Sequence, residues 1–220
     1  MTRKLNVHRR GALSGKTRSV VVFLHGYGAD GQDLLGLADP LAPHLKDTVF
    51  LAPDAPEPCP GNPFGFQWFP IPWLDGSSEA AAADGLARSA ADLDGFLDGV
   101  CADEGVKPSE LALVGFSQGT MISLHVALRR AVPVAGVVGF SGRLLVPERL
   151  SAEIKCRPPV LLIHGDADQV VPPSDMPKAA LALRAAGVEV QTHVSRGVAH
   201  GIAPDGLSLA LGFLKGHLPG

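Results

Sequence analysis

The chain has 220 residues, of which 46% are hydrophobic and 19% are charged, and its formal net charge is −3. The hydrophobic fraction excludes a disordered chain, and the charge balance lacks the excess of Lys and Arg expected of a nucleic-acid binder. The length favours one domain over residues 1–220, with a basic segment at 1–18. The three cysteines are odd in number and far apart, which argues against a disulfide framework and predicts a reducing, cytoplasmic location.

Residues 111–128 form the longest stretch without a charged side chain, and its length is close to that of a membrane-spanning helix. Ser117, Gln118 and His125 interrupt the stretch, so we predict a buried strand followed by a helix, and no membrane span. The first apolar run, at 20–24, is too short for the core of a signal peptide.

Short apolar runs alternate with segments of helical periodicity along most of the chain. The runs are rich in Val, Leu and Ile, which is typical of strands buried on both faces. This alternation predicts an α/β fold, in which a mostly parallel sheet carries helices on both faces and binds ligands at the carboxyl ends of its strands. The expected strands are 19–25, 49–52, 111–116, 134–140, 160–164 and 188–194, and the expected helices are 77–104, 118–130, 175–186 and 204–217.

Residues 53–76 depart from this alternation, because they are rich in proline and show no periodicity. Five of the chain's twelve aromatic residues lie between positions 64 and 73. A long loop with so much aromatic surface is typical of a functional segment, and we interpret it as a wall of the substrate pocket. The alternative is a hairpin that packs on the core.

A nucleophile motif follows the expected strand at 111–116. The sequence GFSQG at 115–119 matches G-x-S-x-G, and it lies between a strand and a helix, as a nucleophile elbow requires. The two glycines avoid steric clashes in this sharp turn, and the helix directs its positive dipole end at the serine. Ser117 is therefore the predicted nucleophile. Ser141 also follows a strand, but it lacks the second small residue and is expected to lie in a simple turn.

A serine hydroxyl needs a histidine base, and the base needs an acid that orients it. On a sheet of this type the acid and then the histidine follow the serine in the chain. The strand at 160–164 runs into Asp166 and Asp168; we favour Asp168 as the acid, and Asp166 stays open as the alternative. Among the eight histidines, His200 is the predicted base, because its loop between the last strand and the last helix can reach the serine.

Attack on a carbonyl group also needs backbone N–H groups that stabilise the developing oxyanion. One such group comes from the residue after the nucleophile, which is Gln118 here. The other comes from the loop after an early strand, where Tyr27 stands between two glycines. We therefore predict an oxyanion hole formed by the N–H groups of Tyr27 and Gln118.

The same early segment allows a different class of function. Residues 26–31 read G-x-G-x-x-G, and Asp54 lies at the distance of a ribose-binding acid, so a dinucleotide-binding protein is an alternative. Asp30 and Asp33 argue against it, because they would repel a pyrophosphate group. The sequence has no C-x-x-C pair and no H-E-x-x-H motif, and we predict neither a metal nor another cofactor. Three acids of the long helix are interpreted as a solvated face: Asp92, Asp94 and Asp98.

Four segments together resemble the phospholipase/carboxylesterase family of α/β-hydrolases, which includes the acyl-protein thioesterases and small bacterial carboxylesterases. The resemblance covers nearly the whole chain, and the four motifs stand in the family's order. It implies the α/β-hydrolase fold and hydrolysis of carboxylic esters or thioesters without a cofactor. The segments are FLHGYG at 23–28, GFSQG at 115–119, HGDADQVVP at 164–172 and AHG at 199–201.

The resemblance also assigns the site. It implies Ser117 as the nucleophile, Asp168 instead of Asp166 as the acid, and His200 as the base. The oxyanion donors it implies are again the N–H groups of Tyr27 and Gln118. The residues expected to contact the substrate are Trp68 and Phe69 in the aromatic loop and Val170 beside the acid.

Two positions depart from the family pattern. Thr120 stands where a glycine is common, and Tyr27 stands where the thioesterases usually carry leucine. The loop at 65–72 is closer to the bacterial esterases. Only 25 residues separate Gly142 from Asp168, which is too few for a helical lid domain.

We therefore expect a serine carboxylesterase with an open pocket that hydrolyses small esters of short to medium chain length. An acyl-protein thioesterase or a lysophospholipase on the same site is the nearest alternative. A non-catalytic binding module with a hydrolase fold is an alternative of another class. We expect no nucleic-acid partner, and a monomer and a homodimer both remain open.

Overall fold

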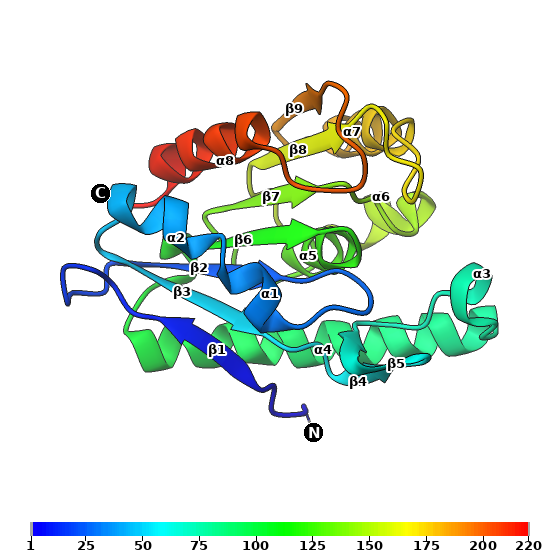
Figure 1. Ribbon diagram of the computed structural model, residues 1–220, viewed down its shortest axis with the longest axis horizontal. Helices are drawn as coiled ribbons and strands as arrows, with labels where there is room; N and C mark the ends of the chain where they lie inside the picture. Colours follow the sequence, from blue (N-terminus) through cyan, green and yellow to red (C-terminus); the bar gives the residue numbers. More distant parts are fainter. Residues whose placement is uncertain (1, 220) are drawn as a thin grey trace.

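A seven-stranded β-sheet forms the centre of the molecule in this computed structural model, which describes residues 2–219 (Figure 1). The strand order is β1-β3-β2-β6-β7-β8-β9, and only β1 runs antiparallel to its neighbour among the paired strands of this sheet. Six strands therefore end at one edge. The strands are β1 (Val7–Arg10), β2 (Ser19–Leu24), β3 (Thr48–Pro53), β6 (Leu111–Phe116), β7 (Gly136–Phe140), β8 (Val160–Gly165) and β9 (Val190–Ser195).

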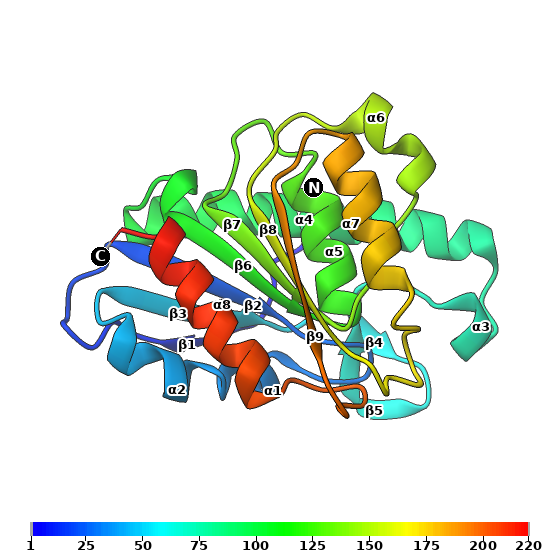
Figure 2. The same ribbon diagram turned by 90° about the horizontal axis from the view of Figure 1, so that it is seen from above.

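Helices cover both faces of the sheet, as the alternation of the sequence predicts (Figure 2). One face carries α4 (Glu79–Glu104), α5 (Gln118–Ala127) and α7 (Asp175–Ala185). The other face carries α1 (Gly31–Leu35), α2 (Ala38–Leu41) and α8 (Pro204–His217). Shorter helical turns are η1 (Ala42–His44), α3 (Pro72–Asp75), η2 (Pro108–Glu110), η3 (Pro147–Arg149) and α6 (Leu150–Glu153).

The sheet separates two hydrophobic clusters, because successive side chains of a strand point to opposite faces. In β2, Val20 and Val22 pack with the α4, α5 and α7 layer, whereas Val21 and Phe23 pack with the α1, α2 and α8 layer. Every residue of β2 is buried. Apolar runs without polar alternation are the sequence signature of this two-sided burial.

The uncharged stretch 111–128 divides at Ser117 into β6 and α5, as predicted. Both elements lie inside the α/β layers. Within residues 2–219, no helix combines the length and the hydropathy needed to cross a membrane.

Two segments differ from the expected elements. Residues 7–10 form the edge strand β1 although their sequence, VHRR, contains no apolar run. Charged side chains are common on sheet edges, where they discourage pairing with other chains. Residues 53–76 contain a hairpin of β4 (Glu57–Cys59) and β5 (Asn62–Gln67), which is the alternative architecture named for this loop.

The expectation of a solvated acidic face on α4 is wrong for Asp92. Its side chain is 5% exposed and accepts hydrogen bonds from the backbone N and the Nε of Arg3, both at 2.7 Å. Asp94 and Asp98 are exposed, and both form ion pairs with the buried guanidinium of Arg130. The three acids therefore tie α4 to other parts of the chain.

Candidate active site

Ser117 occupies a strained turn between the end of β6 and the start of α5. Its φ of 54° and ψ of −116° lie in a region that residues other than glycine rarely adopt. A Cβ atom at Gly115 would collide with the backbone of Gly119, and one at Gly119 would collide with the carbonyl oxygen of Leu24. Both small residues of the motif are therefore required by close backbone contacts in this turn.

Asp168 and His200 are in direct contact beyond the ends of β8 and β9. Nδ1 of His200 lies 2.8 Å from Oδ2 of Asp168, while Oδ1 accepts hydrogen bonds from the N–H groups of Val170 and Val171. Burial by itself raises the pKa of Asp168, but the hydrogen bonds from His200 and the two N–H groups outweigh it and lower the pKa. The carboxylate therefore stays ionised and can fix the imidazole.

Asp166 also accepts a hydrogen bond, but from another loop. Its Oδ1 lies 2.6 Å from the backbone N of Gly197, in the segment that leads to His200. This bond ties the acid loop to the histidine loop. Asp166, the alternative acid, therefore caps a backbone group across two loops, and Asp168 is the aspartate that contacts His200.

His164 is a further site residue, for which the sequence predicts only the end of a strand. Its ring is buried, and its Nε2 lies 3.0 Å from the carbonyl oxygen of Val171 and 3.2 Å from Oδ2 of Asp168. Because a carbonyl oxygen only accepts, Nε2 must carry a proton that faces both oxygens. His164 thus faces Oδ2 of Asp168, whereas the two backbone donors bind Oδ1. No spacing rule in the sequence marks this role.

The ring of His200 packs on Phe116, the residue that precedes Ser117. The rings of His200 and Phe116 are tilted by 45° with centroids 4.8 Å apart. Within residues 2–219, the hydroxyl of Ser117 makes no hydrogen bond, to His200 or to any other group, and the residue is 8% exposed. Serine–histidine hydrogen bonds are often long without substrate and shorten in the reactive complex.

The loop after β2 lies against the serine turn. A Cβ atom at Gly26 would lie 3.3 Å from Cβ of Ser117, so Tyr27 follows a residue in contact with the elbow. Gln118 is the first residue of α5, and the first N–H groups of a helix have no partner within it. The two predicted oxyanion donors therefore belong to segments that meet at Ser117.

The side chain of Gln118 links the elbow to the aromatic loop. Its Oε1 accepts from the N–H of Trp68 at 2.8 Å, and its Nε2 donates to the carbonyl oxygen of Phe69 at 2.7 Å. The indole N–H of Trp68 donates to the carbonyl oxygen of His25 at 3.0 Å. Trp68 is wholly buried in the core, so the expectation that its side chain borders the substrate is not met; it anchors the loop.

Phe69 lines a groove of about 770 Å³ between α4, α5 and the segment after β7. Phe69 belongs to an apolar part of the lining, and the ion pair between Arg129 and Glu153, at 2.7 Å, belongs to the same lining. The expected contact residue Val170 lies outside this groove, next to Asp168, and is 65% exposed. Phe69 and Val170 thus do not line the same groove.

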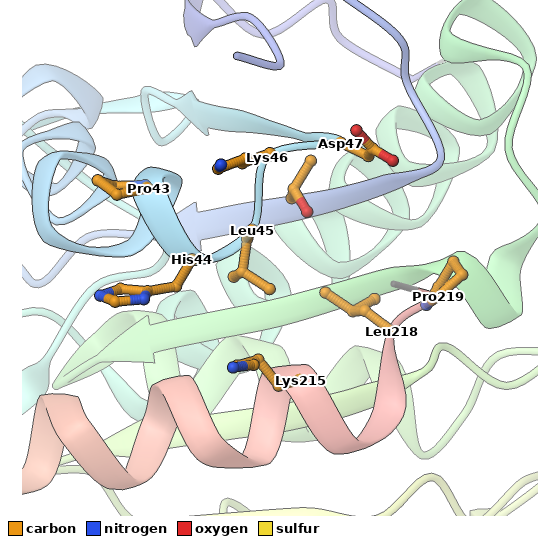
Figure 3. A pocket seen from close by; sticks show the side chains of 9 residues that line it. Pro43, His44, Leu45, Lys46, Asp47, Lys215, Leu218 and Pro219 are labelled. Carbon is orange, nitrogen blue, oxygen red and sulfur yellow. The ribbon is translucent and has the colours of Figure 1, made fainter. Parts of the chain in front are cut away.

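A second pocket, of about 350 Å³, lies at the opposite edge of the sheet (Figure 3). It is formed where the turn before β3 meets the end of α8, and its lining includes Leu45, Lys46, Lys215 and Leu218. None of the predicted site residues lines it. The chemistry expected at the carboxyl ends of the strands is therefore separate from this pocket.

Thr120, the departure from the family's glycine, joins two strand ends. Its Oγ1 lies 2.8 Å from the carbonyl oxygens of both Gly115 and Phe140. Its side chain occupies space that a Cβ atom at Gly139 or Gly142 would need. The larger residue is therefore accommodated by glycines on the neighbouring strand and the turn after it.

The dinucleotide alternative is not supported by the position of Asp54. The carboxylate is 6% exposed and accepts hydrogen bonds from the N–H of Gly31 at 2.8 Å and from Asn6 at 2.6 Å. Burial raises its pKa, but these bonds and the nearby His8 lower it overall. The acid that would hold a ribose is therefore occupied by the start of α1.

The positions of these residues on the sheet define a class of protein. A serine at a strand-to-helix elbow, with a paired aspartate and histidine beyond later strands of a parallel sheet, is the architecture of an α/β-hydrolase. The sequence model of the phospholipase/carboxylesterase family matches residues 12–218. The chain belongs to that family, which confirms the resemblance drawn from its four motifs.

Relatives of known name agree with this assignment. Acyl-protein thioesterase 1 of Saccharomyces cerevisiae is 30% identical over 218 residues, which cover 90% of this chain and 92% of the relative. Esterase YpfH of Escherichia coli K12 is 26% identical and covers 92% of this chain and 84% of its own length.

Solved structures share the architecture. The crystal structure of esterase PE8 superposes with a TM-score of 0.93 at 44% identity, and the match covers 98% of this chain and 100% of that one. Acyl-protein thioesterase 2 of Zea mays has a TM-score of 0.79 at 26% identity and covers 97% and 99% of the two chains. The α/β-hydrolase fold and the assignment as a hydrolase are thereby established for this chain.

Proposed function

We propose that this chain is a serine carboxylesterase whose triad is Ser117, Asp168 and His200. The observation that carries the proposal is the 2.8 Å contact between Asp168 and His200, with the His200 ring packed on Phe116 beside the strained serine. A buried carboxylate that binds Nδ1 leaves Nε2 of the neutral imidazole as the proton acceptor. The base is therefore in the tautomer that serine catalysis needs.

In the first half of the reaction, Oγ of Ser117 forms a bond with the ester carbonyl carbon while its proton passes to Nε2 of His200. The carbonyl oxygen becomes an oxyanion that accepts hydrogen bonds from the N–H groups of Tyr27 and Gln118. The bond between carbon and the alcohol oxygen then breaks. His200 returns the proton to that oxygen, and the acyl group stays on Ser117.

In the second half, water takes the place of the alcohol. His200 removes a proton from the water, whose oxygen attacks the acyl carbon, and the second oxyanion uses the same two N–H groups. Collapse of this intermediate releases the carboxylic acid and returns the proton to Ser117. Asp168 remains ionised throughout and stabilises the imidazolium form of His200.

The groove beside Phe69 supports short to medium acyl chains. Its lining combines apolar side chains around Phe69 with ion pairs among Arg129, Arg149 and Glu153. A long alkyl chain that extended over these ion pairs would take water away from charged groups, which costs free energy.

The nucleophile is tested by hydrolysis of p-nitrophenyl butyrate. We expect Ser117→Ala to lower kcat by at least about 10⁴-fold, because the covalent pathway is lost. Ser141→Ala is the matched control, since Ser141 also follows a strand at positive φ, and it should retain the activity of the unmodified chain. Equal activity of the two variants would contradict the assignment.

The acyl preference is tested with a series of p-nitrophenyl esters below their solubility limits. We expect kcat/KM for acetate, butyrate and octanoate to exceed that for palmitate. A variant with Arg129→Leu, Arg149→Leu and Glu153→Leu should improve the longest soluble esters, because it removes these charges from the lining of the groove. A palmitate ester that is the best substrate of the unmodified chain would overturn the preference.

Thioester hydrolysis is a second candidate, favoured by the 30% identity to the yeast acyl-protein thioesterase 1. The same triad can attack either carbonyl group, so the leaving group decides. The ratio of kcat/KM for matched butyryl thioester and oxygen ester, compared with their ratio of hydroxide-catalysed rates, separates the two. A ratio far above the chemical one would make the thioester the preferred substrate.

A further inference from the structure

The β4–β5 hairpin packs directly on the loop that is proposed to hold the oxyanion. The N–H of Gly28 donates to the carbonyl oxygen of Phe66 at 2.9 Å, and the N–H of Phe66 donates to that of Ala29 at 2.8 Å. Ala29 and Phe66 form an isolated antiparallel bridge. A Cβ atom at Gly65 would overlap the carbonyl oxygen of Gly28, so no side chain separates the two backbones there.

Asn62 adds a side-chain bond to this backbone contact. Its Nδ2 donates to the carbonyl oxygen of Gly28 at 2.7 Å, and its Oδ1 accepts from the N–H of Phe64 at 3.2 Å. The first bond joins the hairpin to the loop, whereas the second stays within the hairpin. Asn62 therefore fixes the peptide group after Gly28 and stabilises the turn from which it reaches.

The peptide group before Tyr27 is fixed from the other side. Nε2 of His25 accepts from the N–H of Ala55 at 2.9 Å, so the ring proton is on Nδ1, which donates to the carbonyl oxygen of Gly26 at 2.7 Å. Burial lowers the pKa of His25, and the neutral ring suits this role. Because the peptide is trans and planar, the N–H of Tyr27 points away from this carbonyl and from His25.

These contacts matter because the loop has little rigidity of its own. Tyr27 stands between Gly26 and Gly28, and Gly28 has a φ of 79°. Glycines on both sides allow the N–H of Tyr27 to take many directions. An oxyanion hole stabilises a transition state only when its donors are oriented beforehand, so the direction has to be imposed by neighbouring segments.

We propose that the β4–β5 hairpin is a positioning element of the oxyanion hole and that Asn62 is its positioning residue. The inference rests on the proposed function, which makes the N–H of Tyr27 an oxyanion donor. His25 holds the peptide before Tyr27, while Asn62 and Phe66 hold Gly28 after it.

The test uses two replacements of Asn62 that both lack the hydrogen-bond donor to Gly28. Asn62→Asp keeps an acceptor for the N–H of Phe64 but cannot donate to Gly28, and Asn62→Ala removes both bonds without adding charge. We expect both to lower kcat about 10- to 100-fold with little change in KM, because a misdirected donor weakens only the transition state. Phe64→Ala, at an 85% exposed position of the same hairpin, is the control and should keep the unmodified kcat.

A second readout separates positioning from general damage to the fold. Affinity for a trifluoromethyl ketone, whose adduct carries an oxyanion, should fall by the same factor as kcat/KM in both Asn62 variants. The pH profile should keep its shape, since the Asp168–His200 pair is untouched. Thermal unfolding midpoints should stay close to that of the Phe64→Ala control.

Each outcome bears on the inference. If Asn62→Asp and Asn62→Ala are folded and keep kcat and ketone affinity, the hairpin does not position the donor and the inference is overturned, while the proposed function stands. If KM rises in both variants by a factor similar to the fall in kcat, Asn62 only supports the fold in general, and the inference is also overturned. If Ser117→Ala retains full activity, the proposed function fails first, and the two failures are thus distinguishable.

Discussion

Two neighbouring strands of the sheet are each followed by a serine with nearly the same positive φ, yet only one of these serines is the proposed nucleophile. Ser117 follows β6 with a φ of 54°, and Ser141 follows β7 with a φ of 48°. Each donates its N–H at 2.9 Å to a carbonyl oxygen near the end of the next strand, Ser117 to Phe140 and Ser141 to Ile163. Positive φ is therefore common to both turns and does not single out the proposed nucleophile.

The difference lies in the residues after each serine and in the groups that face it. A helix starts at Gln118, so Ser117 lies at the positive end of α5, whereas Ser141 leads into Gly142 and an irregular segment. Ser117 retains some exposure and lies beside the ring that packs on His200. The hydroxyl of Ser141 is buried and, among residues 2–219, has no hydrogen-bond partner. The helix after Ser117 and the proposed base His200 therefore distinguish this turn from the Ser141 turn, whereas positive φ does not.

The largest effect in this comparison, after loss of Ser117 itself, is expected at the acid. Asp168→Asn should lower kcat by about 10³- to 10⁴-fold, because an amide cannot hold His200 in the reactive tautomer. Asp166→Asn is the control, since an amide oxygen can still accept from the N–H of Gly197. Steady-state kinetics on p-nitrophenyl butyrate would contradict the account if both variants lost activity equally.

The next effect concerns α5, the helix that starts directly after Ser117, whereas an irregular segment follows Ser141. Burial, assisted by the charge of Arg129, lowers the pKa of His125 in this helix to about 4. Between the unfolded pKa of about 6.5 and pH 4, the unfolded chain binds a proton that the folded chain does not, so the free energy of unfolding falls as the pH falls. Partial exposure of the ring limits this loss to about 2 kcal/mol.

Urea unfolding at several pH values measures this contribution. His125→Gln cannot bind the proton, so its free energy of unfolding should fall less steeply than that of the unmodified chain across this range. Other groups titrate equally in both chains, and the difference between the two curves isolates His125. Parallel curves would show that His125 is protonated equally in the folded and unfolded chains.

A smaller effect is expected at Thr120, which bonds to the ends of both β6 and β7. Thr120→Val keeps the shape but leaves the carbonyl oxygen of Gly115 without this donor, and should lower the free energy of unfolding by about 1–2 kcal/mol. We expect a few-fold loss of kcat, because the serine turn keeps only the N–H of Ser117 as its hydrogen bond to Phe140 of the next strand. Ser123→Ala, which removes a hydroxyl bond inside α5, should leave kcat unchanged.

The smallest effect is expected at Ser141, and it has the opposite sign. Ser141→Gly removes a buried hydroxyl without a described partner and relieves a positive φ, so the chain should be stabilised by about 1 kcal/mol. Activity should not change, which sharpens the contrast with Ser117. A loss of activity in the folded variant would give this second turn a part in the reaction.

All strands of the central sheet except the edge strand β1 were predictable from the sequence, and so was the turn between β6 and α5. Strands buried on both faces leave uninterrupted apolar runs, and the positions of β6 and of α5 are set by the composition on either side of Ser117. The spacing of G-x-S-x-G reports a local steric requirement, which the close approach of Gly119 to Leu24 explains. A steric requirement within one turn therefore appears as a short motif in the sequence.

The features that the sequence could not indicate depend on partners far away in the chain. Asp92 is buried because Arg3 reaches it from 89 positions away, and no periodicity of α4 records that contact. His164 contacts Asp168 only because the loop folds back over the end of β8. Likewise, the contact of Asn62 with Gly28 joins a hairpin and a loop 34 positions apart.

The most direct test of the central claim, that Ser117 alone of these two serines is activated by His200, is covalent labelling. The chain is treated with a fluorophosphonate, and the modified peptide is identified by mass spectrometry. The account predicts one phosphonate, on Ser117, and strongly slowed labelling in His200→Gln. A label on Ser141, or none in a folded chain that still hydrolyses esters, would contradict it.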